Sequence, residues 1–131
     1  MEATDSQFEI KKNIDDEWVS LIASGDYSLI KAYHLFEFAI DNAIAEKKSK
    51  VLIEVTGVTG NISLTDRFQY SNFLSDYYEE HALGKVNKIA VVGSDLNVHS
   101  EKFGQIVARN RGANVCVFTD MDKAVNWLTE K

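Results

Sequence analysis

The sequence predicts an α/β fold with a mixed, mostly parallel β-sheet and an antiparallel hairpin at its N-terminal edge. Short runs rich in Val and Ile alternate with longer segments whose apolar residues recur at helical spacing, which is the pattern of parallel β-α-β units. Two strand-like stretches precede the first helical segment with only a turn between them, which indicates the hairpin. The expected order of elements is β-β-α-β-α-β-α-β-α, in a single domain that covers residues 1–131.

The hairpin is expected from Phe8 to Asn13 and from Trp18 to Ala23, with Asp15-Asp16 in the turn. The residues of the second stretch alternate in the way of a half-buried antiparallel strand. We therefore expect the hairpin to form one edge of the sheet.

Ser28 is the expected N-cap of a first helix that runs to about Lys48. At about 100° per residue, one face of this helix is apolar and is expected to face the core. Its members are Leu29, Ala32, Tyr33, Phe36, Ala39, Ile40, Ala43 and Ile44. Leu35 and Phe38 fall outside this stripe.

A buried strand is expected from Val51 to Val55, followed by a loop that includes residues 55–61. The second helix is expected to begin near Ser63 or Thr65, because Ser63 with Asp66 resembles a capping box. It is expected to end near residues 83–84. Its apolar stripe is Tyr70, Phe73, Leu74 and Tyr77, and Phe68 lies opposite that stripe.

The C-terminal part of the chain predicts two further β-α pairs. Strands are expected from Lys88 to Val92 and from Val115 to Phe118. A helix from Ser100 to Gly112 is expected between them, and Thr119 with Asp122 predicts the cap of a last helix.

Composition limits the function classes. The net charge of −6 argues against nucleic acid as a partner. The single Cys116 suits a reducing compartment, and neither a signal peptide nor an apolar run long enough for a membrane span is present, so we expect a cytoplasmic protein. The acidic excess lies in the hairpin and the second helix, which leaves a local headgroup contact near Arg109 and Arg111 open.

Several motifs resemble one known family. They are Ser63–Arg67, Lys88–Gly93, Phe103–Gly112 (FGQIVARNRG) and Val117–Asp120, which leads to Ala124 and Trp127-Leu128. With the element order, they resemble the STAS domain, the anti-sigma-factor-antagonist fold, and in particular its bacterial branch of small stand-alone STAS/SEC14-like proteins.

The resemblance implies a STAS-like fold and a non-enzymatic regulatory or binding module. Sporulation-type members carry a phosphorylatable serine at the start of the second helix, in an Asp-Ser-Ser/Thr-Gly pattern. Here that place reads Asn61–Asp66 (NISLTD), which lacks the pattern but offers Ser63 and Thr65. The branch also resembles lipid-transfer domains in outline, which implies a small amphiphile or peripheral membrane contact.

The edge at the carboxyl ends of the parallel strands is the expected binding site, because ligands of open α/β sheets bind there and helix N-termini favour anions. The candidate ligand- or anion-binding residues are Asn61, Ser63, Thr65, Arg67, Ser94 and His99. Four of them have a simpler alternative: Ser63 and Thr65 as caps, Arg67 as a surface pair with Asp66 or a neighbouring acid, and His99 as an exposed loop residue.

An apolar contact surface or ligand cavity is a second candidate site. Leu35, Phe38 and Phe68 are its expected members if the first two helices lie side by side. The alternative is that single exposed apolar residues are ordinary.

The preferred function is a non-enzymatic module that recognises a partner protein or a small amphiphilic or anionic ligand, with peripheral membrane contact and a homodimer also open. The alternatives are a phosphoswitch at Ser63 or Thr65 and, less favoured, a small hydrolase. There is no Gly-x-Ser-x-Gly motif, Cys116 lies in an expected buried strand, and His34, His81 and His99 lack the spacing of metal ligands. No cofactor and no metal are expected.

Overall fold

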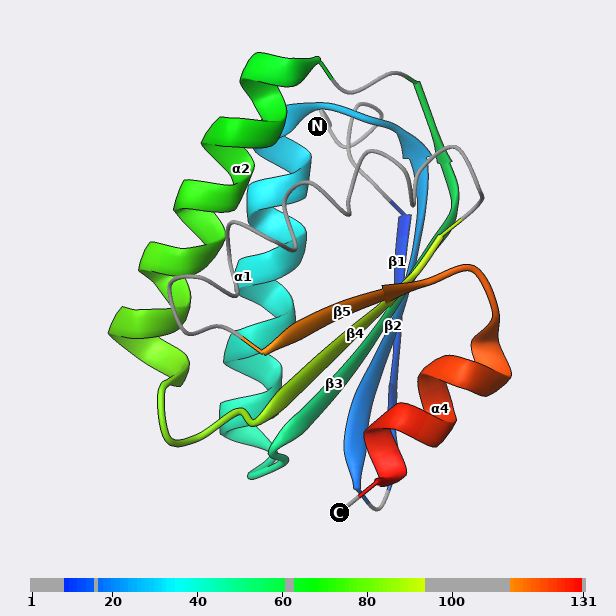
Figure 1. Cartoon of the computed structure of the whole chain (residues 1–131), viewed down its shortest axis with the longest axis vertical. Helices are drawn as coiled ribbons and strands as arrows, with labels where there is room; N and C mark the ends of the chain where they lie inside the picture. Colours follow the sequence, from blue (N-terminus) through cyan, green and yellow to red (C-terminus); the bar gives the residue numbers. More distant parts are fainter. Residues whose placement is uncertain (1–8, 16, 61–62, 94–113, 131) are drawn as a thin grey trace.

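The computed structural model describes residues 9–15, 17–60, 63–93 and 114–130 (Figure 1). In chain order the elements are β1 (Glu9–Ile14), β2 (Trp18–Asp26), α1 (Leu29–Ala45), β3 (Lys50–Thr59), α2 (Leu64–Tyr77), a π-helical turn η2 (Tyr78–Ala82), β4 (Lys88–Val92), β5 (Val115–Phe118) and α4 (Met121–Thr129). The expected helix from Ser100 to Gly112 and the Phe103–Gly112 motif lie outside the described residues.

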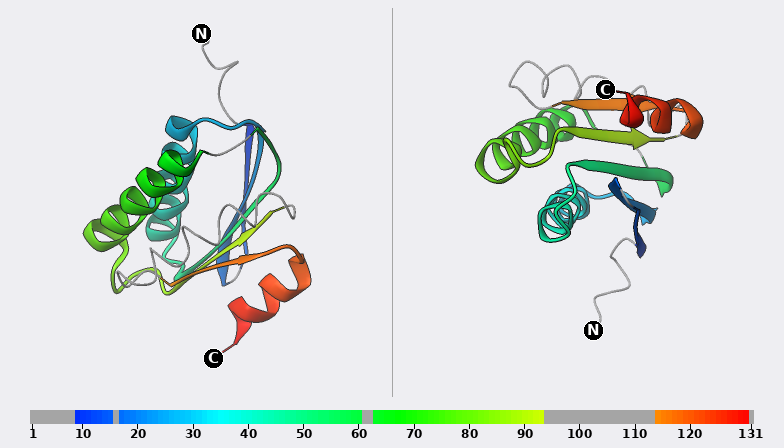
Figure 2. Two further views of the ribbon diagram at one scale, coloured as in Figure 1. Left: turned by 45° about the horizontal axis from the view of Figure 1, so that its top comes forward. Right: turned by 90° about the horizontal axis from the view of Figure 1, so that it is seen from below.

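The strands form one five-stranded sheet in the order β1-β2-β3-β4-β5. β1 pairs with β2 antiparallel, and the other neighbours pair in parallel. The predicted mixed sheet with an antiparallel N-terminal edge is therefore confirmed. Because β-α-β crossovers are right-handed and β2, β3 and β4 follow one another in the same direction, α1 and α2 lie on the same face. Figure 2 shows α4 on the opposite face.

The expected loop at residues 55–61 is wrong for most of its length, because β3 continues to Thr59. Val58 and Thr59 pair with Gly25 and Asp26 at the end of β2, so strand pairing outweighs the turn propensity of the glycines. Gly57 is required by a close approach: a Cβ at this position would lie 3.0 Å from Cβ of Ser24.

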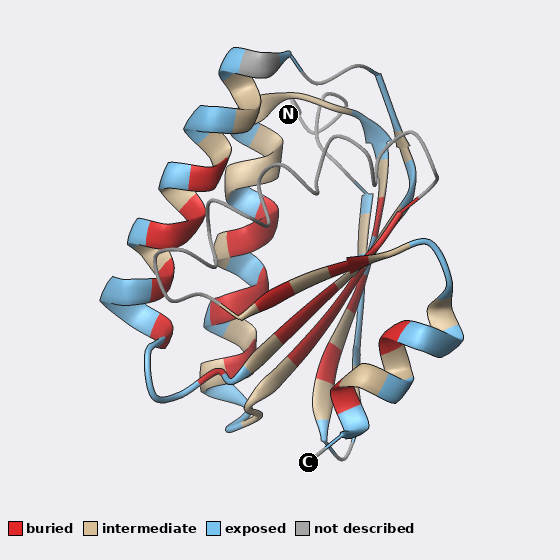
Figure 3. Cartoon of the chain, in the orientation of Figure 1, coloured by how far each residue is buried: buried red, intermediate tan, exposed pale blue. Residues whose placement is uncertain are grey.

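The larger core lies between the sheet and α1, with α2 and η2 beside them. Leu21, Phe36 and Ile53 are at most 3% exposed, and buried residues follow the inner side of α1 in Figure 3. Leu35 belongs to this core and is 5% exposed, so the expectation that it lies outward is wrong. The buried side of α1 is wider than the predicted stripe because the helix packs on both β2 and β3.

The smaller core lies between α4 and the opposite face of the sheet. Its buried members are Leu52, Ala90, Val92, Ala124 and Leu128. Asp120, not Thr119, caps α4, since its Oδ1 accepts a hydrogen bond from the Asp122 N–H at 2.8 Å.

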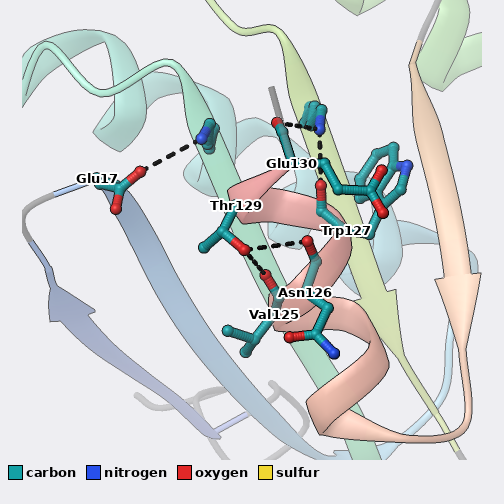
Figure 4. Close-up of polar contacts among 8 residues, drawn as sticks. Glu17, Val125, Asn126, Trp127, Thr129 and Glu130 are labelled. Carbon is teal, nitrogen blue, oxygen red and sulfur yellow. Dashed lines mark hydrogen bonds and ion pairs between the residues drawn. The ribbon is translucent and has the colours of Figure 1, made fainter.

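The side chain of Lys88 on β4 caps the C-terminus of α4. Its Nζ donates to the carbonyl oxygens of Trp127 and Glu130 at 2.6 and 2.9 Å (Figure 4). A cation at this position also complements the helix dipole. None of the helices in the described part of the chain has the length and apolar character needed to cross a membrane.

Candidate functional site

The first turns of α1 and α2 lie at the same edge of the sheet, where β2 and β3 end (Figure 1). Each helix begins at a serine. Ser28 Oγ accepts from the Lys31 N–H at 3.2 Å, and Ser63 Oγ accepts from the Asp66 N–H at 3.1 Å. Both predicted N-caps are confirmed, and each satisfies one of the backbone donors left free at a helix start.

A hydrogen bond between side chains joins the two helix starts. Tyr27, directly before the α1 cap, donates from Oη to Oδ2 of Asp66 in the first turn of α2, at 3.2 Å. Asp66 thus accepts from Tyr27, and its negative charge also suits the positive end of the α2 dipole. Burial raises the pKa of the neighbouring Tyr33, and the Asp66 charge raises it further.

Hydrogen bonds at the ends of β2 and β3 fix the backbone of Tyr27. Its backbone N–H donates to the carbonyl oxygen of Thr59 at 2.7 Å, and Thr59 Oγ1 donates to Oδ1 of Asp26 at 2.7 Å. Gly60 has φ +106°, a left-handed conformation that favours glycine and turns the chain away from β3. The edge is therefore held by backbone and side-chain bonds together.

Ser63 and Thr65 are both exposed at this edge, as is required for access by a partner or a kinase. Arg67 is half-buried, and its Nε is buried without a hydrogen-bond partner among the described residues. Asn61, Ser94 and His99 lie outside the described residues, as do Arg109 and Arg111. Ser63, Thr65 and Arg67 all lie at the start of α2, but Thr65 and Arg67 are two residues apart and so point about 200° apart around the helix.

The electrostatics of the described edge are mixed. Asp26 and Asp66 lie at this edge, alongside Lys31 and Arg67. Lys31 Nζ donates to the Asp26 carbonyl oxygen at 2.9 Å. Since Asp66 already occupies the first turn of α2, a free anion would meet a carboxylate there.

The predicted apolar contact surface does not form as expected. α1 and α2 do lie side by side, and Phe38 and Phe68 are 40% and 47% exposed, but Leu35 is buried. The rings that meet between the helices are Tyr33 with Phe73, at 4.2 Å between centroids, and Phe36 with Tyr77, at 6.2 Å.

Phe38 and Phe68 point away from the seam between α1 and α2, where the rings of Tyr33, Phe36, Phe73 and Tyr77 meet. Phe38 follows Tyr33 by five residues and Phe68 precedes Phe73 by five, which turns each side chain about 140° around its helix from the ring contacts. The two exposed rings therefore lie on opposite flanks of the helix pair and do not rim one cavity.

The seam ends in a second tyrosine–aspartate pair. Tyr77 Oη donates to Oδ1 of Asp41 at 2.7 Å. Burial raises the pKa of Tyr77, and the hydrogen bond and charge of Asp41 and the charge of Glu37 raise it further. The ring of Tyr77 also contacts that of His81, with centroids 4.3 Å apart and the two planes tilted by 41°.

Within the described ranges, no group of three or more His, Cys, Asp or Glu side chains could hold a metal ion. Cys116 is a free, half-buried thiol on β5 rather than a buried one, because its side chain lies on the face that α4 covers only in part.

Sequence reasoning missed Tyr27. The signal for Ser28 and Ser63 is local, since a cap precedes an apolar helical pattern. The partner of Tyr27 is 39 residues away in sequence, and no short-range pattern predicts such a pair.

Comparisons with known proteins agree with the fold. A crystal structure of an anti-sigma factor antagonist from Mycobacterium paratuberculosis aligns with a TM-score of 0.61 at 17% identity, over 99% of this chain and 100% of that chain. An uncharacterized protein of the DUF3478 family with a SpoIIAA-like fold, from Shewanella loihica PV-4, aligns with a TM-score of 0.52 at 16% identity, over 93% of each chain.

A comparison with curated proteins found no match. The model of the SpoIIAA-like family matches residues 19–129, most of the chain, and confirms the resemblance to STAS domains. This family supports the interpretation that the chain is not an enzyme. The chain belongs to the SpoIIAA-like family.

Proposed function

We propose that this chain is a regulatory binding module that docks a protein partner at the edge formed by the first turns of α1 and α2. The observation that carries the proposal is the Tyr27–Asp66 hydrogen bond of 3.2 Å, which ties the two helix starts together while Ser63 and Thr65 stay exposed. An edge that is already ordered loses little conformational freedom when it binds. The similar structure described as an anti-sigma factor antagonist supports a regulatory class and a protein partner.

Quantitative affinity capture from lysate of the source cell tests this proposal. Thr65→Lys adds a long charged side chain at the exposed edge and should lose a partner that the parent chain enriches. Asn126→Lys is the matched control, because Asn126 is exposed on α4, on the opposite face of the sheet (Figure 2). Equal enrichment with the Thr65 variant and with the control would refute docking at this edge.

A phosphoswitch at Ser63 or Thr65 is the second candidate. Both side chains are exposed, and a phosphate on Thr65 would stand beside the Asp66 carboxylate. Repulsion between the two charges would weaken the Tyr27–Asp66 bond and so alter the docking edge. Intact mass and peptide mapping of the protein from its own cell should show a phosphate that Ser63→Ala or Thr65→Val removes; an unmodified chain under all growth conditions contradicts the switch.

Other ligands are less favoured. The carboxylates of Asp26 and Asp66 at the edge oppose a small anionic ligand. Native mass spectrometry of the purified chain would detect a bound amphiphile, and flotation with liposomes would detect peripheral membrane contact. A cytoplasmic location remains a prediction that cell fractionation can check.

A further inference from the structure

One face of the sheet is covered only in part by the described elements. α4 packs on β3, β4 and β5, and Figure 4 shows β1 and β2 beside α4 rather than beneath it. Ile22 of β2 is 47% exposed on this open part. The antiparallel β1–β2 pair can leave one face to solvent, but β2 also pairs in parallel with β3, and parallel strands are usually covered on both sides.

The strand register shows what surrounds Ile22. Lys11 of β1 pairs with Ile22, and Ile22 pairs with Glu54 of β3, so the three residues form a row across the sheet. The row lies on the α4 face, because Glu54 continues to Val92 of β4, which is in the core under α4. An exposed apolar side chain thus stands between a cation and an anion.

We propose that this open face is the interface of a symmetric dimer of two copies of this chain. A two-fold axis parallel to β2 and passing over Ile22 places Ile22 of one copy against Ile22 of the other. The same rotation exchanges the two sides of the row, so Lys11 of each copy faces Glu54 of the second copy. Neighbouring strands lie about 4.8 Å apart, which puts the two charges at equal distances from the axis.

The layers fit this arrangement. Two packed sheets lie about 10 Å apart, and a helix lies at about the same distance from the sheet that it covers. In the dimer, α4 of one copy would therefore lie in the same layer as the sheet of the second copy, next to the β1 edge of that sheet. Ser20, which precedes Ile22 on the same face of β2, accepts a hydrogen bond from Nε1 of Trp18 at 3.0 Å, so the Trp18 ring borders the proposed interface. Two-fold contacts require a self-complementary patch, and this row has that property.

A second copy suits the row better than an unrelated partner, because both charges find their opposites without any residue from elsewhere. Glu54 is already oriented, since its Oε2 accepts from Thr56 Oγ1 at 2.9 Å. Lys12, the next residue of β1, lies on the other face and donates to Oδ1 of Asn42 at 2.8 Å. It supplies a matched control for Lys11.

Charge reversal tests the dimer by sedimentation velocity over a range of concentrations. Lys11→Glu and Glu54→Lys should each raise the dimer dissociation constant by about tenfold or more, because like charges then face each other twice. Mixing the two variants should restore the affinity in a heterodimer, since the carboxylate introduced at position 11 then faces the ammonium group introduced at position 54. The double variant should restore it in a homodimer for the same reason. Lys12→Glu should leave the dissociation constant unchanged.

Circular dichroism checks that each variant is folded, and Ile22→Ser gives a milder disruption if a charge reversal unfolds the chain. A parent chain that is monomeric at every concentration overturns the proposal. A dimer that responds to Lys12→Glu as much as to Lys11→Glu, or that mixing does not restore, also overturns it. The interface does not include Ser63 or Thr65, so the dimer can fail while partner docking at the edge stands, and the reverse also holds.

Discussion

At the level of single residues, the edge is built from hydroxyl groups that donate to aspartates. Tyr27 with Asp66 and Thr59 with Asp26 are the pairs at the helix starts. The exposed Thr59–Asp26 bond, at 2.7 Å, has the length of a charge-assisted hydrogen bond, whereas the part-buried Tyr27–Asp66 bond, at 3.2 Å, is longer. The side chains that a partner would meet are thereby held in one arrangement.

Tyr27→Phe removes the hydroxyl and keeps the ring. We expect the free energy of unfolding to fall by about 1 kcal/mol, the usual net value of one hydrogen bond. Urea denaturation measures it. In a double-mutant cycle with Asp66→Ala, which leaves no acceptor, the two losses should not add, and full additivity would mean that the bond between them contributes nothing.

The raised pKa of Tyr77 predicts a stability change at alkaline pH. The pKa of Tyr77 is higher in the folded chain than the ordinary value of 10.0, so the folded chain favours the neutral phenol. The resulting gain in the free energy of unfolding is complete below about pH 10 and is lost as the pH rises above it. Burial also raises the pKa of Tyr33 and Tyr78, so they share this slope. Denaturation at a series of pH values should therefore show a shallower alkaline decline for Tyr77→Phe than for the parent chain; identical declines would contradict the assignment.

Single residues also show where sequence reasoning succeeds. Ser28 and Ser63 were predictable as caps because a cap depends on the next few residues only. The prediction of Thr119 as the cap of the last helix was wrong, because Asp120, one residue later, is an equally good cap and lies at the true start of α4. The prediction that Leu35 lies outside the core was wrong, because helical periodicity gives the centre of a buried face but not its width.

At the level of elements, the two short strands β4 and β5 were predicted with their observed bounds, because buried β-branched runs with clear ends leave few alternatives. The end of β3 was not predicted correctly, because Gly57 and Gly60 resemble turn residues. Its continuation depends on pairing with the end of β2, a contact between segments about 30 residues apart. Local patterns carry no information on such pairing.

The packing of α1 predicts different costs for two neighbouring phenylalanines. Phe36 is 1% exposed and touches the rings of Phe73 and Tyr77, so Phe36→Ala should lower the free energy of unfolding by about 3–5 kcal/mol. Phe38 is 40% exposed, so Phe38→Ala is the matched control and should change it by about 0.5 kcal/mol or less. Guanidinium denaturation of both variants compares them, and equal losses would contradict the orientation of α1.

At the level of the whole molecule, the fold class followed from the sequence because the alternation of strands and helices admits few topologies once crossovers are right-handed. The same logic predicted that the start of α2 lies at the carboxyl edge of the sheet. It could not predict that Tyr27 would join α1 to α2, nor which face of the sheet would stay open beside α4. Both depend on where whole elements come to lie.

We propose above all that a protein partner docks on the first turns of α1 and α2. Amide hydrogen exchange of the chain, alone and with the protein that it captures, tests this most directly. We predict slower exchange on binding at residues 26–28 and 63–67, with α4 unchanged. Slower exchange in α4 or β1, with residues 26–28 and 63–67 unaffected, would contradict the claim.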